Sequence, residues 1–464
     1  MDASARNVNG LFRIIFNKRR INKLARASGF VQRESELDGY NFVVAMTLGS
    51  LSSANKSLSS LIGSISDVVT RSALHQRIDE SAALLMKRVL EYGIKQISSK
   101  RCSLSPGVFR RFNRILVWDS SSWGLHESLR KVFKGKGGSA SRAAVMLQYA
   151  YDVKSSVLEY FDIASGSLND QSYQEQIAAT VQRRDLILMD RGYFSAKLFK
   201  AIGKKSAYYI SRLKVGPFLY LRSGEDYNKL DILRLLQRNK DKTLLEFETF
   251  LGRGSEKLSC RIVCVRLADA KANGKIRKLK KEARSRGKQL SKARRIFARW
   301  TIFITNVPRE KLSAMEIAKM YRVRWDVELV FRQLKSTFGI NKISHKNECR
   351  LRCEIYATLI MAALVQYTHG ITQQYAWRVW KKEISLEKLF KHVKQNAQLL
   401  LRAVTWERKH LAKRISEFYD PISIRCIKQH QHSRQTTFEK LLKFTKKTKS
   451  FLINERKLTQ YACA

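Results

Sequence analysis

The chain has 464 residues, of which 44% are hydrophobic, so it is long enough for several domains that each bury a core. Lys and Arg number 89 while Asp and Glu number 39, which gives a formal net charge of +50. Because like charges at this density disfavour a compact state unless a polyanion neutralises them, this balance argues against an ordinary metabolic enzyme. We expect double-stranded DNA as the partner, since a membrane surface fits less well with basic residues spread along the whole chain.

Three features bear on the cellular compartment. The longest apolar stretch, residues 356–367, is too short to span a bilayer and predicts a buried core helix, so we expect no membrane association. The N-terminus lacks the apolar core of a signal peptide, which predicts a cytoplasmic, nucleoid-associated protein. The pairs Cys260/Cys264 and Cys349/Cys353 lack the two-residue spacing of zinc ribbons, so free thiols are favoured over a zinc site.

Residues 1–107 read as a helical domain. Apolar periodicity predicts helices over residues 20–28, 41–51, 58–65 and 70–97. Two interpretations remain open for this basic module: a DNA-binding domain, which we favour, or a helical cap that packs on the next domain.

Residues 108–213 change to short apolar runs that alternate with helical patterns. The runs predict strands, and the order of elements favours an α/β fold with a mixed sheet and helices packed on it. We expect strands at residues 115–118, 144–153, 157–163, 186–189 and 207–212, and helices at 172–182 and 195–202.

Residues 214–312 read as a strand-rich insertion with a basic arm. Strands are expected at residues 243–251, 259–267 and 300–307. Between them, residues 271–299 hold thirteen Lys or Arg and a single acid, Glu282, a bias too strong for an ordinary solvated face.

Beyond the insertion the chain reads as helical. Residues 313–345 carry one continuous predicted helix over 314–340, and residues 346–464 form a helical C-terminal region for dimerisation or DNA contacts. That region ends in a basic amphipathic segment, 438–460.

Two carboxylates follow buried strands in the same manner. Asp119 ends the run ILVW and Asp190 ends the run LILM. Ligand sites in open sheets form at the carboxyl ends of strands, and two such acids on neighbouring strands suit a shared divalent metal. The alternative is that each Asp simply starts a turn.

The predicted helix over 314–340 presents a narrow polar stripe. Tyr321, Arg324, Glu328 and Lys335 fall within about 60° of one another at 100° per residue, beside an apolar face. The stripe is a candidate site, with an ordinary Arg324–Glu328 surface ion pair as the alternative.

With these residues in place, the sequence resembles the DDE transposases of bacterial cut-and-paste insertion sequences, in the group of insertion sequence family four that the YREK signature defines. Tyr321, Arg324, Glu328 and Lys335 match that signature at every spacing, and the first two acids lie in WDSSS and DRGYF. The resemblance covers roughly residues 110–370. It implies a ribonuclease-H-like mixed-sheet core with the strand-rich insertion before the third acid.

The resemblance also implies roles for single residues. Asp119, Asp190 and Glu328 would hold two Mg²⁺ ions, for which Mn²⁺ can substitute, and would catalyse DNA cleavage. Tyr321, Arg324 and Lys335 would grip DNA phosphate, and Trp300 would stack on a flipped base. Core packing is an equal alternative for Trp300.

The function implied is transposition: cleavage at element ends and transfer of the freed strand to target DNA, through a hairpin intermediate, by a homodimer in a synaptic complex. Two other functions remain open. One is a non-catalytic DNA-binding protein, and the other is a two-metal nuclease without strand transfer.

Overall fold

The computed structural model describes residues 3–33, 36–52, 57–63, 69–100, 107–137, 141–214, 216, 218–223, 225–252, 257–343, 345–405, 408–429, 451–452 and 458–461. It consists of two compact units, each built from separate stretches of the chain. The first unit comprises Met1–Leu104, Ser120–Leu168 and Asp326–Arg434, and the second comprises Ser105–Asp119, Asn169–Trp325 and Gln435–Ala464.

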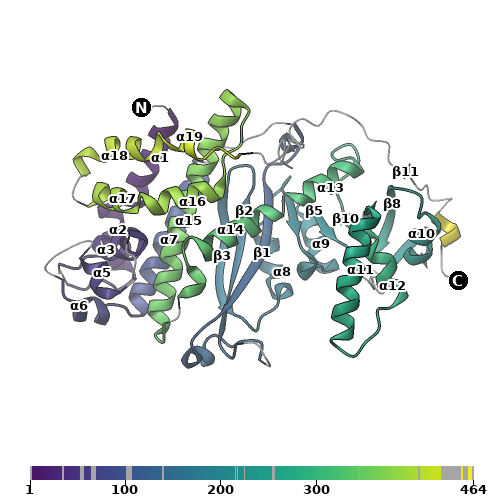
Figure 1. Ribbon diagram of the computed structural model, residues 1–464, viewed down its shortest axis with the longest axis horizontal. Coiled ribbons are helices and arrows are strands. Elements are labelled where there is room, and N and C mark those ends of the chain that lie inside the picture. The colour runs from purple at the N-terminus through teal and green to yellow at the C-terminus, as the bar shows by residue number, and fades with distance from the viewer. Residues whose placement is uncertain are drawn as a thin grey trace. The chain divides into compact units, whose positions relative to one another are not determined.

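The first unit is mainly helical. In chain order its elements are α1 (Ala3–Ile15), α2 (Lys18–Ala27), α3 (Gly39–Val44), the π-helical segment η1 (Ala45–Gly49), α4 (Ser50–Ser52), α5 (Leu58–Ile62), α6 (Arg71–Gln76), α7 (Glu80–Ser99), η3 (Glu127–Lys131), β2 (Ala144–Asp152), β3 (Val157–Ser165), α14 (Trp325–Ser336), η6 (Ile340–Lys342), α15 (Glu348–Trp380), α16 (Leu386–Gln395), α17 (Ala397–Val404), η7 (Arg408–His410), α18 (Leu411–Tyr419) and α19 (Ile422–Arg425) (Figure 1).

The core of this unit forms around α15. The helix is apolar on nearly every side, as expected for a helix surrounded by protein. It packs against α7, α1, η1, α16 and the antiparallel hairpin β2–β3. The buried core helix predicted over residues 356–367 is therefore confirmed. Among the described residues, no helix is long and apolar enough to span a membrane.

One predicted helix of this unit is wrong. Instead of a continuous helix over residues 70–97, the chain forms α6 and α7, because the backbone is extended at Asp79, which caps α7. The Asp79 side chain accepts a hydrogen bond from the Ala82 amide at 2.9 Å, which satisfies a backbone donor that a helix start leaves open. The predicted basic segment 438–460 lies outside the described residues, apart from 451–452 and 458–460.

The second unit carries most of a mixed sheet. Its elements are η2 (Gly107–Arg111), β1 (Ile115–Gly124), η4 (Asp170–Tyr173), α8 (Gln174–Thr180), β4 (Leu186–Met189), η5 (Arg191–Tyr193), α9 (Ala196–Lys204), β5 (Tyr208–Arg212), β6 (Leu219–Ser223), β7 (Asp226–Lys229), α10 (Ile232–Arg238), β8 (Leu244–Leu251), β9 (Leu258–Arg266), α11 (Asp269–Arg284), α12 (Lys292–Ala298), β10 (Trp300–Thr305), α13 (Ala314–Arg322), β11 (Phe451–Leu452) and η8 (Thr459–Tyr461) (Figure 1).

Strand order explains how the insertion joins the core. Within this unit the strands run β1-β4-β5-β10-β9-β8-β6-β7, and β11 pairs with β8. The pairs β1–β4 and β4–β5 are parallel, whereas β5–β10, β10–β9 and β9–β8 are antiparallel. The insertion therefore extends the core sheet through β10, and the predicted mixed α/β sheet is confirmed. The basic arm folds as α11 and α12 beside β10.

Candidate active site

Asp119 and Asp190 lie at the same edge of the sheet. The parallel register of β1 and β4 ends with Trp118 opposite Met189, and each aspartate comes next in its chain. All four residues of each run that precedes an aspartate are buried, which is typical of central parallel strands. Because neighbouring strands are about 4.8 Å apart and paired residues share a face, the two carboxylates project from adjacent positions.

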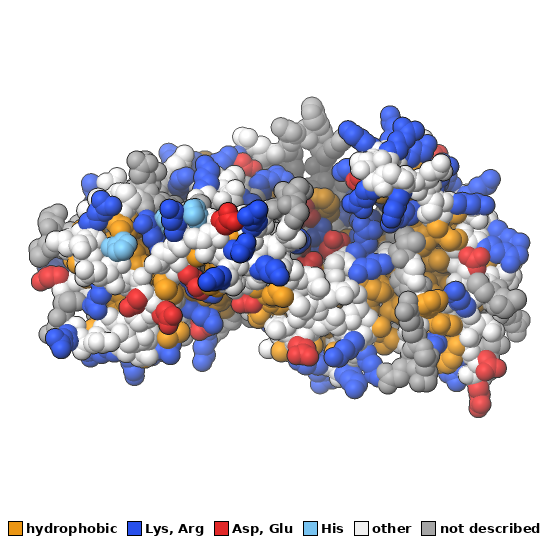
Figure 2. Space-filling view, turned by 90° about the horizontal axis from the view of Figure 1, so that it is seen from below, with side chains coloured by type: hydrophobic (Ala, Val, Ile, Leu, Met, Phe, Trp, Pro, Cys, Tyr) orange, Lys and Arg blue, Asp and Glu red, His pale blue; other side chains and the backbone are white. Residues whose placement is uncertain are grey.

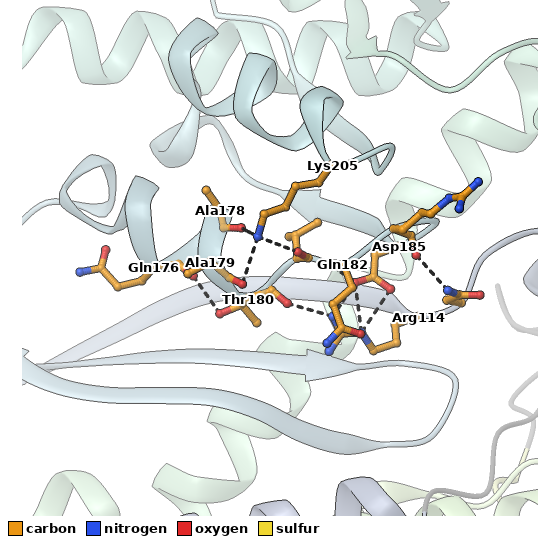
Figure 3. Close-up of polar contacts among 11 residues, drawn as sticks. Arg114, Gln176, Ala178, Ala179, Thr180, Gln182, Asp185 and Lys205 are labelled. Atoms are coloured by element: carbon orange, nitrogen blue, oxygen red, sulfur yellow. Dashed lines mark hydrogen bonds and ion pairs between the residues drawn. The ribbon is translucent and has the colours of Figure 1, made fainter.

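A buried ion pair fixes the opposite ends of these two strands. Arg114 precedes β1, and its Nε and Nη2 lie 3.1 and 2.5 Å from Oδ2 of Asp185, which precedes β4 (Figure 3). Oδ2 also accepts from the Gln182 amide at 2.7 Å. Lys205 donates to three carbonyl groups at the end of α8, including that of Val181 at 3.1 Å (Figure 3). This network sets the register that brings the two aspartates together.

Tyr321 of α13 contacts the second aspartate. Its hydroxyl donates to the Met189 carbonyl at 3.2 Å and to Asp190 Oδ1 at 3.3 Å, and its ring packs on Phe303 of β10. Burial, followed by the nearby Asp190 charge, raises the pKa of Tyr321 well above its ordinary value. The phenol therefore remains protonated and can donate throughout the neutral range.

Arg324 contacts the first aspartate. Its Nη1 lies 2.9 Å from Asp119 Oδ2, and the two side chains are only 8% and 18% exposed. The structure thus gives Arg324 an ion pair with Asp119. Two of the four signature residues touch the two strand-end acids.

The predicted single helix over residues 314–340 is wrong. The chain forms α13 and α14, and between them Val323 and Arg324 donate their amides to Met320 and Tyr321, three residues back. This tighter i→i−3 bonding ends the α-helical ladder. The four signature residues consequently do not form one stripe on a single helix.

The other two signature residues belong to the first unit. Glu328 lies partly exposed on the first turns of α14, and Lys335 lies near its end. Burial lowers the pKa of the Lys335 ammonium group. Within the described part of the chain, no group of three or more His, Cys, Asp or Glu side chains gathers as a metal site.

The donor chemistry of the aspartate pair nevertheless fits a hard divalent ion. Asp119 and Asp190 offer carboxylate oxygens, which Mg²⁺ prefers. The guanidinium of Arg324 already forms an ion pair with Asp119, so this edge of the sheet stabilises a positive charge. Within the second unit, Asp119 and Asp190 are the residues that would hold the metal.

Trp300 is buried at the start of β10. Its side chain is 3% exposed and borders a cavity of about 670 Å³ within the insertion. The cavity combines an apolar wall with cations, namely Lys240, Arg266, Lys280, Arg295 and Arg299. On the face drawn in Figure 2, Lys and Arg side chains are far more widespread than Asp and Glu. This combination suits an anionic ligand with an apolar part.

A group of cations near Asp190 was not predicted from the sequence. Burial lowers the pKa of Arg212, which also interacts electrostatically with Tyr321, Arg191 and Asp190. Burial, with Arg212 and Arg191 nearby, lowers the pKa of Lys275 on α11 to about 8. Arg212 ends β5, the strand next to β4, so its position at the sheet edge can be predicted in the same way as those of the aspartates. Nothing distinguishes Lys275 from the other cations of the basic arm.

The fold is that of a DDE transposase domain. Residues 110–364 match the family model described as "Transposase DDE domain", and the chain belongs to this family. Its ribonuclease-H-like core, with the insertion before the third acid and helical flanks, is confirmed. Members of the family generally use divalent metal ions.

Transposases of insertion sequences match this chain over most of their length at low identity. The transposase for insertion sequence element IS231F of Bacillus thuringiensis subsp. israelensis is 23% identical over 436 residues, covering 90% of this chain and 91% of that protein. The transposase for IS1151 of Clostridium perfringens is 24% identical over 392 residues, or 81% and 83% of the two chains. The cryo-EM structure of the piggyBac transposase synaptic complex with hairpin DNA aligns with a TM-score of 0.46 and 11% identity, over 92% of this chain and 87% of that one.

Proposed function

We propose that this chain is an insertion-sequence transposase of the YREK group, which cleaves double-stranded DNA at the element ends and joins the freed 3′-hydroxyl to target DNA. The observation that carries the proposal is the pairing of Arg324 with Asp119 and of Tyr321 with Asp190. Signature side chains that contact two strand-end acids indicate a functional site. An ion pair along one helix would be an ordinary surface feature. The relatives named above point to insertion-sequence ends as the substrate.

The three acids act together in this proposal. Asp119, Asp190 and Glu328 would hold two Mg²⁺ ions, and Mn²⁺ would be able to substitute. When bound, the ions activate the attacking hydroxyl and stabilise the leaving oxygen of an in-line displacement at phosphorus. In the cleavage step, a water oxygen bonds to phosphorus while the bond to O3′ breaks, which leaves a 3′-hydroxyl and a 5′-phosphate. In the transfer step, that 3′-hydroxyl takes the place of water.

The cations of the site orient the DNA. Arg324 and Lys335 bind phosphate oxygens beside the cleaved bond, Arg324 through two parallel N–H groups and Lys335 as a point charge. Tyr321 keeps its proton and donates to the same backbone. Arg324 must leave or share Asp119 when it does so, because its guanidinium is now held there.

The proposed function includes formation of a hairpin and assembly of a homodimer. Trp300 accepts an unstacked base during formation of a hairpin at the element end, with the cavity beside it open to the attached phosphate. Two copies of the chain bring the two element ends together as a homodimer. Trp300→Ala should reduce hairpin formation more than Trp300→Phe, which keeps an aromatic face.

A product assay tests the proposal. The chain, a duplex carrying the element end, target DNA and Mg²⁺ should give joined molecules. Asp119→Ala, Asp190→Ala and Glu328→Ala should each abolish metal-dependent cleavage while end binding survives. Hydrolysis without joining would mean a nuclease, and binding without either would mean a non-catalytic DNA-binding protein.

A further inference from the structure

The loop that presents Asp190 is held by a short turn from elsewhere in the chain. Directly after Asp190 the chain forms η5, and η4 packs against it. On its other side, the Asp190 carboxylate accepts a hydrogen bond from Tyr321. The position of this acid is therefore set from two sides, by α13 and by η4.

The closest approach between the two turns occurs at Gly192. A Cβ atom at this position would lie 2.3 Å from Oδ2 of Asp170, 3.2 Å from its Cγ and 3.3 Å from its Cβ. The Gly192 backbone does not adopt a positive φ, so its conformation does not require glycine. The three atoms closest to that Cβ position all belong to Asp170, so its side chain occupies space that a Cβ at residue 192 would take.

Hydrogen bonds extend this contact along both segments. Gln171 Nε2 donates to the Phe194 carbonyl at 3.3 Å, and Ser195 Oγ donates to Gln174 Oε1 at 2.7 Å. The turn itself is fixed by Asn169, whose Oδ1 accepts from the Ser172 amide. Residues 170–174 thus contact residues 192–195 along their length, and Asp170 contacts the loop at Gly192, two residues after Asp190.

We infer that Asp170 is a positioning residue for Asp190: its carboxylate, seated against Gly192, sets the path of the loop that presents the second acid. This inference rests on the proposed function, because it is Asp190 as a metal ligand that needs a fixed position. Misplacement of a reacting group by about 1 Å can cost on the order of 100-fold in rate. A steric contact so close to the acid is therefore a sensitive point.

A second-site rescue tests the inference. Gly192→Ala should weaken Mn²⁺ binding, measured by electron paramagnetic resonance, and should lower cleavage by roughly 10- to 100-fold. Adding Asp170→Ala removes Oδ2 and Cγ, the two closest contacts, and keeps the Cβ contact at 3.3 Å. The double variant should recover most of both losses. Asp170→Asn, which keeps the shape of the side chain, should retain more Mn²⁺ affinity than Asp170→Ala.

Controls separate positioning from general stability. Gly203→Ala is the matched variant, since Gly203 on α9 has no atom within 4 Å of its would-be Cβ, and it should behave as the parent. Hydrogen exchange should accelerate at residues 191–195 in Gly192→Ala, at an unchanged melting temperature. A double variant no better than Gly192→Ala, or a Gly192→Ala chain with parental exchange and Mn²⁺ affinity, would overturn the inference. A parent chain that exchanges as expected but neither binds Mn²⁺ nor cleaves would refute the proposed function instead.

Discussion

Arg324 Nη1 lies 2.9 Å from Asp119 Oδ2, so a cation of the signature occupies a carboxylate that the proposed metals need. Both side chains are nearly buried, and the attraction between them is less screened than that of a surface pair. In the absence of metal, Arg324 offsets the charge of Asp119 at the sheet edge. Metal loading and release of Arg324 to the DNA phosphate are then linked events.

This competition predicts the effect of Arg324→Gln on metal binding. Removing the competing cation should tighten Mn²⁺ binding by about 5- to 30-fold, the equivalent of 1–2 kcal/mol. The same change should lower DNA cleavage, because a phosphate contact is lost. Titration of the two chains with Mn²⁺, followed by electron paramagnetic resonance, measures the first effect. Arg322→Gln, at an exposed position two residues earlier, serves as the control. Equal or weaker binding in Arg324→Gln would argue against competition.

The local sequence pattern was sufficient to predict where the two strand-end acids lie. The runs ILVW and LILM are fully buried and pair in parallel, so the position of Asp119 and Asp190 follows from hydrophobic burial and strand direction. Arg212 ends β5, the next strand of the sheet, so its position follows from burial and strand direction in the same way. The start of α7 was missed, although Asp79 is a good N-cap residue, because the apolar periodicity of residues 70–97 favoured a continuous helix.

The break between α13 and α14 could not be read from the chain. No Gly or Pro interrupts residues 314–336, and every local signal favours one helix. The break coincides with tertiary contacts, since Tyr321 and Arg324 reach the two aspartates from the end of α13. The contact of Asp170 with Gly192 is likewise invisible in sequence, because it joins two turns that only the fold brings together.

The pair Arg114–Asp185 predicts a large stability effect far from the signature. Arg114→Met leaves Asp185 buried without its cation, which should lower the free energy of unfolding by about 3–5 kcal/mol. The double variant Arg114→Met with Asp185→Asn should recover part of this loss. Urea denaturation monitored by circular dichroism measures both. The exposed pair Arg142–Glu127 is the control, where Arg142→Met should leave the free energy of unfolding nearly unchanged. Equal losses at the two pairs would contradict a structural role for the buried one.

His369 predicts how the first unit responds to acid. Its Nδ1 lies 2.9 Å from Ser156 Oγ and its Nε2 lies 3.2 Å from the Ile384 carbonyl, an arrangement that suits the neutral ring. Burial lowers the pKa of His369 to about 4, below its ordinary 6.5. The unfolded chain therefore binds this proton first as the pH falls. Stability is fully present above about pH 6.5 and is lost progressively towards pH 4, by up to about 3 kcal/mol.

Unfolding free energies across this pH range test the role of His369. In His369→Gln the acid-dependent loss should shrink, although stability at neutral pH falls because two hydrogen bonds change. His75→Gln, at an exposed position on α6, should leave the pH profile as it is in the parent. If His369→Gln lost as much free energy of unfolding towards pH 4 as the parent, other groups would be responsible for the acid sensitivity.

The cavity beside Trp300 predicts a local contribution to DNA binding. If Lys280 and Arg295 contact phosphates, replacing both with Ala should reduce the slope of log affinity against log salt by about 2, because each lost contact removes roughly 0.9. Fluorescence anisotropy with a labelled duplex over a salt series measures the slope. The matched control is Lys278→Ala with Lys281→Ala, two exposed cations of α11 that do not border the cavity. A diffuse basic surface would give both double variants the same loss, whereas a phosphate site in the cavity requires the larger change at Lys280 and Arg295.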